Sequence, residues 1–344
     1  MKSSLLQKSV LVLLLLVLFF GGIYFAAPFF KPLAVAFLIA LLMLRLARKA
    51  EGKGANRLWS SIIAVFIVVA FLTLISGLLG YQANQMSDNS KQLERQGKQK
   101  IETLQKTLEK KTGLTSKQLE SFFQNTGHSQ LKSTAKNIAS SILNSLTDLL
   151  LTLIYTFLFL YYRRHLKRFV LKLMDKKYRE QTRKTMEESG EIALQYLGAK
   201  FILIGILATI YSIGLTLLGV KYAIFYSVLA ALLSLIPYIG NMIGAAFPLL
   251  MAIIYNDTAT ALGVVALFAV AQFIESYFLE PLIVGKKVNL NPMMTILIAV
   301  LGGILWGVPG MIIAIPYLGI IAIIFSKIEE MKPVAYLLMD EDNR

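Results

Sequence analysis

Glu275 is the strongest candidate for chemistry in this sequence of 344 residues, because few ionisable side chains lie inside its apolar blocks. It occurs in the segment VAQFIESYFLEP, with Gln272 one helical turn earlier on the same helix face. An ionisable residue within an apolar membrane segment is costly and is therefore a candidate functional residue. The carboxylate could carry a proton or meet a sodium ion, as coupled transport requires. Alternatively, it only accepts hydrogen bonds that fix helix packing.

Two interrupted apolar blocks form a second candidate site. Block 222–254 is broken at PYIGN (237–241), and block 293–325 is broken at WGVPG (306–310). Each block would be about 50 Å long as a straight helix, which is too long for one membrane span and too short for two. Proline removes a helix donor and glycine permits turns, so we expect two re-entrant helical hairpins. A kinked single span and two short tilted spans remain alternatives.

The hairpin tips could hold ions or polar solutes without charged side chains, because a helix broken at mid-membrane directs unpaired backbone groups into the protein. The candidates at the first tip are Ser234, Pro237, Tyr238, Gly240 and Asn241. The second tip offers mainly backbone, through Gly307, Pro309 and Gly310, although its glycines could instead serve close helix packing. Residues near the following membrane boundary could act in gating: Glu280, Pro281, Asn291 and Pro292.

The composition excludes most enzyme chemistry. Hydrophobic residues make up 56% of the sequence and charged residues 16%, whereas a soluble domain carries about 25% charged residues. There is no cysteine and there are two histidines, so thiolate and histidine metal clusters are not expected. The sequence also lacks GxxxxGK[ST], HExxH and GxSxG motifs. We therefore expect a membrane protein that is not an enzyme and that has no cofactor or metal.

Six further apolar runs predict full transmembrane helices, and the first of them, with about 20 residues, is long enough to cross the hydrocarbon core. They lie at 10–30, 32–47, 58–80, 138–162, 201–219 and 258–279. Pro28 and Pro32 are expected to make the turn between the first two. A cleaved signal peptide is an alternative for the first run, but that run exceeds a usual signal core. The predicted fold class is therefore all-α: a polytopic membrane protein with about six spans and two hairpins.

Basic residues predict the orientation. They cluster at 45–57 and at 163–184, and the positive-inside rule places both segments in the cytoplasm. Both termini are then expected in the cytoplasm, and segment 81–147 outside. Apolar residues recur at helical spacing in that outer segment, so we expect amphipathic helices there that pack on each other, on the membrane or on another subunit. Self-association into a homo-oligomer is expected on this basis.

The expected organisation has an extracytoplasmic helical segment and a carboxyl-terminal transport core. In order, the parts are helices 1–3 (1–80), the outer segment (81–147), helix 4 (148–162), a basic interfacial helix (163–190), the core with both hairpins (191–330) and a cytoplasmic tail (331–344). Apolar residues alternate with the charges at 163–184, so we expect this stretch to bind anionic lipid. Nucleic-acid binding is not expected, because no recognised binding motif surrounds these charges.

Three linked motifs resemble a known family. They are PYIGNMIGAAFP at 237–248, ESYFLEPLIVGKKVNLNPMMTIL at 275–297 and GGILWGVPGMIIAIPYLGI at 302–320. They look like the carboxyl-terminal half of the autoinducer-2 exporter family, also called PerM-type permeases. The recurrent residues of that family that are present here are Pro237, Gly240, Glu275, Pro281, Pro292, Gly307, Pro309, Gly310 and Pro316. The resemblance implies a bacterial inner-membrane permease, because family members have been assigned export of autoinducer-2 or sodium/proton exchange.

Two classes of function follow as hypotheses. In the first, the chain is a secondary transporter that exports a small polar solute such as autoinducer-2, or exchanges a monovalent cation (Na⁺ or Li⁺) for protons. Its site would form where the two hairpins, dipping into the bilayer from opposite faces, meet beside Glu275. In the second, the chain is a non-transporting scaffold whose outer helices and basic segment recruit partners or lipid.

Overall fold

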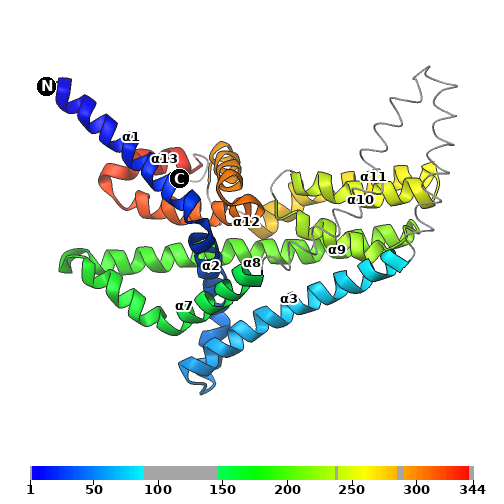
Figure 1. Ribbon diagram of the computed structural model, residues 1–344, viewed down its shortest axis with the longest axis horizontal. Helices are drawn as coiled ribbons and strands as arrows, with labels where there is room; N and C mark the ends of the chain where they lie inside the picture. Colours follow the sequence, from blue (N-terminus) through cyan, green and yellow to red (C-terminus); the bar gives the residue numbers. More distant parts are fainter. Residues whose placement is uncertain (1, 89–145, 237–238, 285–289, 341–344) are drawn as a thin grey trace. The chain divides into compact units, whose positions relative to one another are not determined.

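The computed structural model describes residues 2–88, 146–236, 239–284 and 290–340, and these are helical almost throughout (Figure 1). Helices long and apolar enough to cross a membrane are Ala27–Gly52, Arg57–Tyr81, Lys176–Leu217, Thr258–Ile283 and Pro292–Ser326. Shorter apolar helices are Leu13–Phe25, Ala223–Leu233 and Gly240–Tyr255. The prediction of an all-α polytopic membrane protein is thus confirmed. Of the expected outer segment, residues 89–145 lie outside the described part of the chain.

The chain divides into two compact units, which we describe separately. Unit 1 comprises residues 1–67, 147–199 and 284–344, and unit 2 comprises residues 68–146 and 200–283. The long helices α3 (Arg57–Asp88) and α8 (Arg179–Leu217) each contribute residues to both units. The division into six parts that we expected along the sequence stays a prediction.

Unit 1 begins with α1 (Lys2–Phe25) and α2 (Ala27–Gly52), and the turn between them is not where we expected it. The helix is interrupted at Ala26, which has φ −92° and ψ 23°. Pro28 lies in the first turn of α2, where a missing backbone N–H costs nothing and the fixed φ of proline suits the helix. Pro32 is buried inside α2. The prediction that both prolines make the turn was therefore wrong.

α7 (Leu146–Leu173) carries the described part of the expected fourth span and runs on through the first basic residues. The backbone then becomes extended at Asp175 and returns to helix in η1 (Lys176–Tyr178) and α8. Small side chains let α2, α3 and α7 pack closely, since Ala40, Ala47 and Ala64 are buried together with Leu160. The basic stretch 163–184, expected as one helix or a helical pair, is formed by the end of α7, by η1 and by the start of α8.

An ionic cluster fixes the end of α2 against α7. Glu51 accepts hydrogen bonds from Arg163 and from the hydroxyl of Ser60, the latter at 3.0 Å. The side chains of Arg163 and Glu51 are only 16% and 19% exposed. A charge pair that is this sheltered from water is costly to break, because the remaining partner keeps its charge in a poorly solvated place.

We expect Glu51→Gln to lower the free energy of unfolding by about 1–3 kcal/mol, since it leaves the charge of Arg163 without a carboxylate partner. Equilibrium unfolding of the purified protein in mixed micelles would measure this. Glu191→Gln is the matched control, because it breaks the Arg45–Glu191 pair, in which both side chains are 59% exposed. Exposed pairs contribute about 0–1 kcal/mol, so equal losses in the two variants would contradict the prediction.

The interrupted block 293–325 forms a helical hairpin within unit 1. The helical backbone of α12 (Pro292–Ser326) is broken at Gly307, which has φ 66° and ψ −146°. A Cβ atom on Gly302 would lie 2.5 Å from the carbonyl oxygen of Gly310. Residues eight positions apart in a straight helix would be separated by about 12 Å, so the chain reverses at Gly307. The predicted break is present at the predicted place.

The carboxyl-terminal part of unit 1 packs on this hairpin. η4 (Glu329–Met331) and α13 (Lys332–Leu338) follow α12, and Leu338 is buried against Leu318 and Ala322. The hairpin is also tied to the amino-terminal helices, because Tyr317 donates a hydrogen bond from its hydroxyl to the carbonyl oxygen of Ala34 at 2.9 Å. The second hairpin, formed by α12, is thus held by contacts with α13 and α2 of its own unit.

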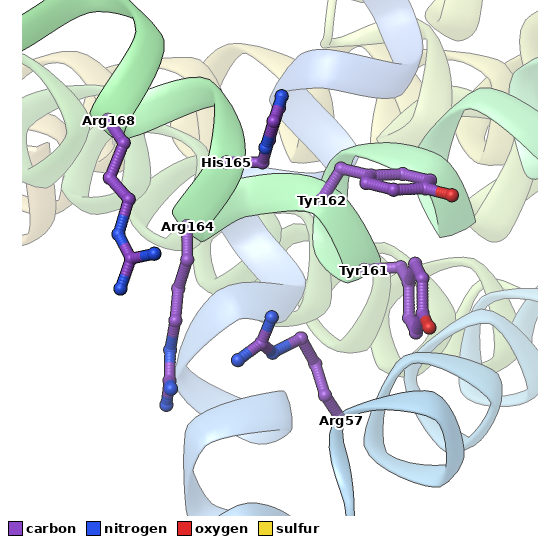
Figure 2. Close-up of a pocket in the computed structure, with 6 residues that line it drawn as sticks. All are labelled: Arg57, Tyr161, Tyr162, Arg164, His165 and Arg168. Atoms are coloured by element: carbon purple, nitrogen blue, oxygen red, sulfur yellow. The ribbon is translucent and has the colours of Figure 1, made fainter. Parts of the chain in front are cut away.

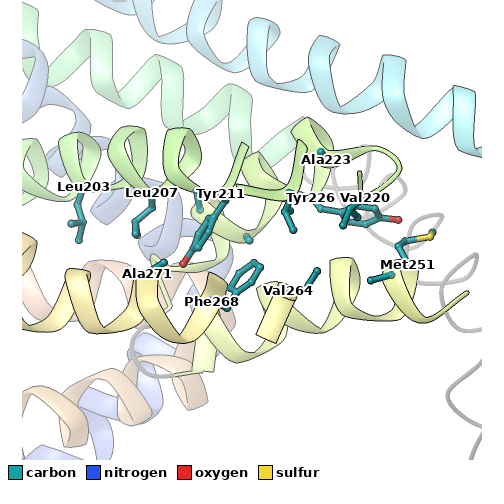
Figure 3. Close-up of a cluster of buried hydrophobic side chains, with 14 residues drawn as sticks. Leu203, Leu207, Tyr211, Val220, Ala223, Tyr226, Met251, Val264, Phe268 and Ala271 are labelled. Carbon is teal, nitrogen blue, oxygen red and sulfur yellow. The ribbon is translucent and has the colours of Figure 1, made fainter. Parts of the chain in front are cut away.

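Unit 2 packs α8 against the first hairpin, formed by block 222–254, and a further helix. Its elements after α8 are α9 (Ala223–Leu233), α10 (Ile239–Tyr255), α11 (Thr258–Ile274) and the π-helix η2 (Glu275–Val284). Figure 3 shows the buried cluster between these helices, in which Tyr211 of α8 stacks on Phe268 of α11 with ring centroids 4.4 Å apart. This apolar core positions the polar end of α11.

α9 and α10 are antiparallel, so the interrupted block 222–254 is also a helical hairpin. A Cβ atom on Gly244 would lie 2.8 Å from Cα of Ala230, and one on Gly240 would overlap the carbonyl oxygen of Leu233. Glycine at both positions therefore permits the close approach of the two helices. The 11 residues of α9 span about 17 Å, less than the hydrocarbon thickness of about 30 Å. That the hairpin is re-entrant remains a prediction.

Candidate functional site

Asn241, near the start of α10, joins the tip of the first hairpin to the end of α11. Its side-chain nitrogen Nδ2 donates to Oε1 of Gln272 at 2.6 Å and to Oε2 of Glu275 at 2.8 Å. Gln272 and Glu275 follow one another on the same side of the helix, as the sequence predicted, and one amide group reaches both. The structure thus brings together three of the residues that we predicted for the site.

Glu275 is enclosed, with 6% of its surface exposed, and lies where the helix changes type. α11 ends at Ile274, and the π-helix η2 begins at Glu275. π-helical turns are rare and are frequent at functional sites, because they displace side chains from regular helical positions. A buried carboxylate requires hydrogen-bond donors, and the amide of Asn241 supplies one.

The amide oxygen of Asn241 is left without a partner. Its Oδ1 atom is buried and accepts no hydrogen bond from the residues that the structure describes. Gln272, by contrast, is exposed, and its Nε2 donates to the hydroxyl of Ser276 at 3.1 Å. The site therefore combines an enclosed carboxylate, an unpaired buried acceptor and an exposed amide. Such oxygen atoms suit the donors of a polar solute or a small hard cation.

The other residues expected at the first tip make different contacts from those of Asn241 or lie outside the described residues. Gly240 is buried at the close approach of the hairpin, and its backbone nitrogen donates to the carbonyl oxygen of Ile236 at 3.1 Å. The hydroxyl of Ser234 donates to the carbonyl oxygen of Ala231 at 2.7 Å, so it satisfies a helix end rather than facing Glu275. Pro237 and Tyr238 lie outside the described residues.

The second tip belongs to the other unit. Gly307 forms the turn and Pro309 is exposed beside it, whereas Gly310 is buried against Gly302. Close packing therefore accounts for Gly310, and the positive φ accounts for glycine at position 307. That this tip contributes to a site with Glu275 stays a prediction.

The residues proposed for gating have structural contacts of their own. Glu280 accepts a hydrogen bond from Lys200 at 3.0 Å and is 48% exposed, in keeping with a place near an aqueous boundary. Pro281 lies within the π-helix η2. Asn291 caps α12, since its side-chain oxygen accepts from the backbone nitrogen of Met293 at 2.9 Å, and Pro292 is the first helical residue. A role for these residues in gating stays a prediction.

Our sequence reasoning overlooked Tyr211. Its hydroxyl is buried and has no hydrogen-bond partner within the described ranges, and Figure 3 shows it directed toward Ala271, one turn before Glu275. A tyrosine in the middle of an apolar run, away from the headgroup level, is the signal that could have identified it. Tyr211 adds a second unsatisfied polar group to this end of unit 2.

The fold and site define a polytopic helical membrane protein with a polar cluster at a broken helix. The model of the AI-2E family transporter matches residues 13–330, so the chain belongs to the AI-2E transporter family. This confirms the resemblance that the three motifs indicated.

Relatives agree with this assignment. The chain is 26% identical to YueF of Bacillus subtilis over 159 residues, which are 46% of this chain and 43% of that protein. It is 29% identical to the AI-2 transport protein TqsA of Escherichia coli over 126 residues, 37% of each chain. A protein of Alkalihalophilus pseudofirmus is 24% identical over 327 residues, covering 89% of this chain and 84% of that protein. The matches to YueF and TqsA thus cover less than half of those proteins.

Proposed function

We propose that the chain is a bacterial inner-membrane secondary transporter that moves a small polar solute, such as autoinducer-2, out of the cell. One observation carries the proposal: Asn241 at a hairpin tip is hydrogen-bonded to both Gln272 and Glu275, while its own Oδ1 atom is buried and accepts no hydrogen bond from the described residues. Membership of the AI-2E transporter family and the similarity to TqsA, an AI-2 transport protein, support the choice of solute.

The site is suited to binding a small polar solute. The enclosed carboxylate of Glu275 and Oδ1 of Asn241 can accept hydrogen bonds from a solute, and the exposed amide of Gln272 lies at the outer side of the same cluster. Binding would exchange hydrogen bonds within the protein for hydrogen bonds to the solute. The helices broken beside the site supply the places where the backbone can bend as access changes.

Exchange of Na⁺ or Li⁺ for protons is the second candidate, because the same cluster offers one negative charge and amide oxygen atoms. A carboxylate that binds either a cation or a proton couples the two, since the ions compete for one site. Counterflow into proteoliposomes distinguishes the candidates. An exporter moves autoinducer-2 down its own gradient with no pH gradient, whereas an exchanger moves Li⁺ or Na⁺ only when protons move in the opposite direction.

We expect Asn241→Ala to lower autoinducer-2 flux about tenfold or more, because it removes the donor to the enclosed carboxylate together with the unpaired acceptor. Asn256→Ala is a matched control, since Asn256 follows the other end of α10 and donates to the carbonyl oxygen of Gly219. Initial rates in proteoliposomes, normalised to the amount of inserted protein, provide the measurement. Equal rates for Asn241→Ala and the parent chain would remove Asn241 from the site.

A further inference from the structure

A basic cavity lies within unit 1, in a part of the molecule that the proposed transport site does not use. Its volume is about 310 Å³, and it is lined by Arg57, Tyr161, Tyr162, Arg164, His165 and Arg168 (Figure 2). This volume is in the range of small-ligand sites, about 300–1,000 Å³. Three of the six lining side chains are arginines and none is acidic.

The cavity is built by one face of α7 and the start of α3. Tyr161, Arg164 and Arg168 recur at helical spacing along α7, so they lie on one side of that helix. Arg57 is the first residue of α3 and comes from a part of the sequence distant from the others. In Figure 2 the guanidinium groups of Arg57 and Arg164 extend into the same space between the two helices. Folding therefore brings Arg57 close to arginines that are more than 100 residues away in the sequence.

Carboxylates balance only part of the positive charge in the cavity. Within the described ranges neither Arg57 nor Arg168 forms an ion pair, and Nε of Arg57 is buried without a hydrogen-bond acceptor. Of the three cavity arginines, Arg164 is paired with a carboxylate, that of Glu51 at 3.9 Å, and Glu51 is also bound to Arg163. Buried donors without acceptors are rare in proteins, and an anion in the cavity would supply acceptors.

The position along α7 indicates the source of the anion. Tyr161 and Tyr162 end the apolar part of the helix, and the basic residues begin at Arg163. Tyrosines at such a transition lie at the level of the lipid headgroups. A guanidinium group can donate two parallel hydrogen bonds to two oxygen atoms of one phosphate, and tyrosine hydroxyls can donate to the same oxygen atoms. This set of side chains therefore matches a phosphate group at the membrane surface.

We propose that this cavity is a specific binding site for the phosphate of an anionic phospholipid, held by Arg57, Arg164 and Arg168. It differs from a general attraction between a basic helix and a negatively charged surface, because Arg57 lies outside the basic stretch 163–184 and lines the same half-open cavity as Arg164 and Arg168. The lipid would join α7 to the start of α3 at one membrane surface.

The test compares two variants of the full-length protein that lose the same charge. In the cavity variant, Arg57, Arg164 and Arg168 are each replaced by Gln; in the control, the exposed residues Lys172, Lys176 and Lys177 of the same basic stretch are replaced by Gln. Both variants are reconstituted in nanodiscs of phosphatidylglycerol and phosphatidylcholine and then released from them. Native mass spectrometry measures the lipid that each protein retains. Parallel samples contain millimolar inorganic phosphate. Far-ultraviolet circular dichroism checks folding.

We expect the cavity variant to retain about tenfold less phosphatidylglycerol than the parent and the control to stay within about twofold of it. Phosphatidylcholine retention should be unchanged, and inorganic phosphate should not displace the lipid. If the triple variant misfolds, the single variant Arg168→Gln must lose phosphatidylglycerol while Lys172→Gln does not. Equal losses in the matched variants, no loss in the cavity variant, or displacement by inorganic phosphate would each overturn the proposal.

Discussion

Glu275→Gln is expected to reduce solute flux about 100-fold or more while leaving the protein folded and inserted. Glutamine has nearly the same volume as glutamate and can still contact Nδ2 of Asn241 through its amide oxygen. What the variant loses is the negative charge and the ability to take up a proton. Helix packing around this residue, which is 6% exposed, should therefore survive the change.

The matched control is Asp257→Asn at the other end of α11. Asp257 caps that helix by accepting from the backbone nitrogen of Thr260 at 2.8 Å, and asparagine caps helices equally well. Flux of autoinducer-2, Na⁺ and Li⁺ would be measured for both variants at equal protein density. A Glu275→Gln protein that transports as fast as the control would show that the carboxylate only supports packing.

Gly240→Ala is expected to have the second largest effect, because it destabilises the hairpin of α9 and α10 rather than removing a group that binds the solute. The added Cβ would overlap the carbonyl oxygen of Leu233 and lie 3.1 Å from Cα of Ser234. Both are backbone atoms at the junction of α9 and α10, so neither can move aside without opening the hairpin. We expect the free energy of unfolding to fall by about 3 kcal/mol and the flux to fall with it, because Asn241 is the next residue.

Gly205→Ala on α8 controls for the loss of a helical glycine. A Cβ at Gly205 meets nothing within 4 Å, and alanine favours helix over glycine by about 1 kcal/mol. The free energy of unfolding of the Gly205→Ala protein, measured in mixed micelles, should therefore equal or exceed that of the parent chain. A Gly240→Ala protein as stable as the Gly205→Ala protein would mean that the tip of this hairpin is looser than the structure indicates.

The sequence was sufficient to predict that both long apolar blocks are broken and fold back on themselves, because proline and glycine have strong backbone preferences. The break at Gly307 and the close approach at Gly240 lie where those residues interrupt the apolar blocks. It was not sufficient to place the turn at Ala26, because alanine carries no turn signal. There the prolines marked the start of α2 rather than the turn itself.

The candidate site could be predicted only in part. Glu275 and Gln272 stand out because polar residues are costly in an apolar helix and their spacing puts them on one face. That Asn241 reaches both depends on how α10 packs against α11, and spacing along one helix does not specify contacts between helices. The basic cavity shows the same limit, because Arg57 joins it through tertiary packing alone.

The central claim is that Asn241 and Glu275 act as one transport site, and a double-mutant cycle tests it most directly. Autoinducer-2 counterflow into proteoliposomes would be measured for Asn241→Ala, Glu275→Gln and the double variant. Residues that share one function are strongly non-additive, so we predict that the double variant transports no more slowly than Glu275→Gln alone. If the two losses multiply in the double variant, the residues act independently and the account is contradicted.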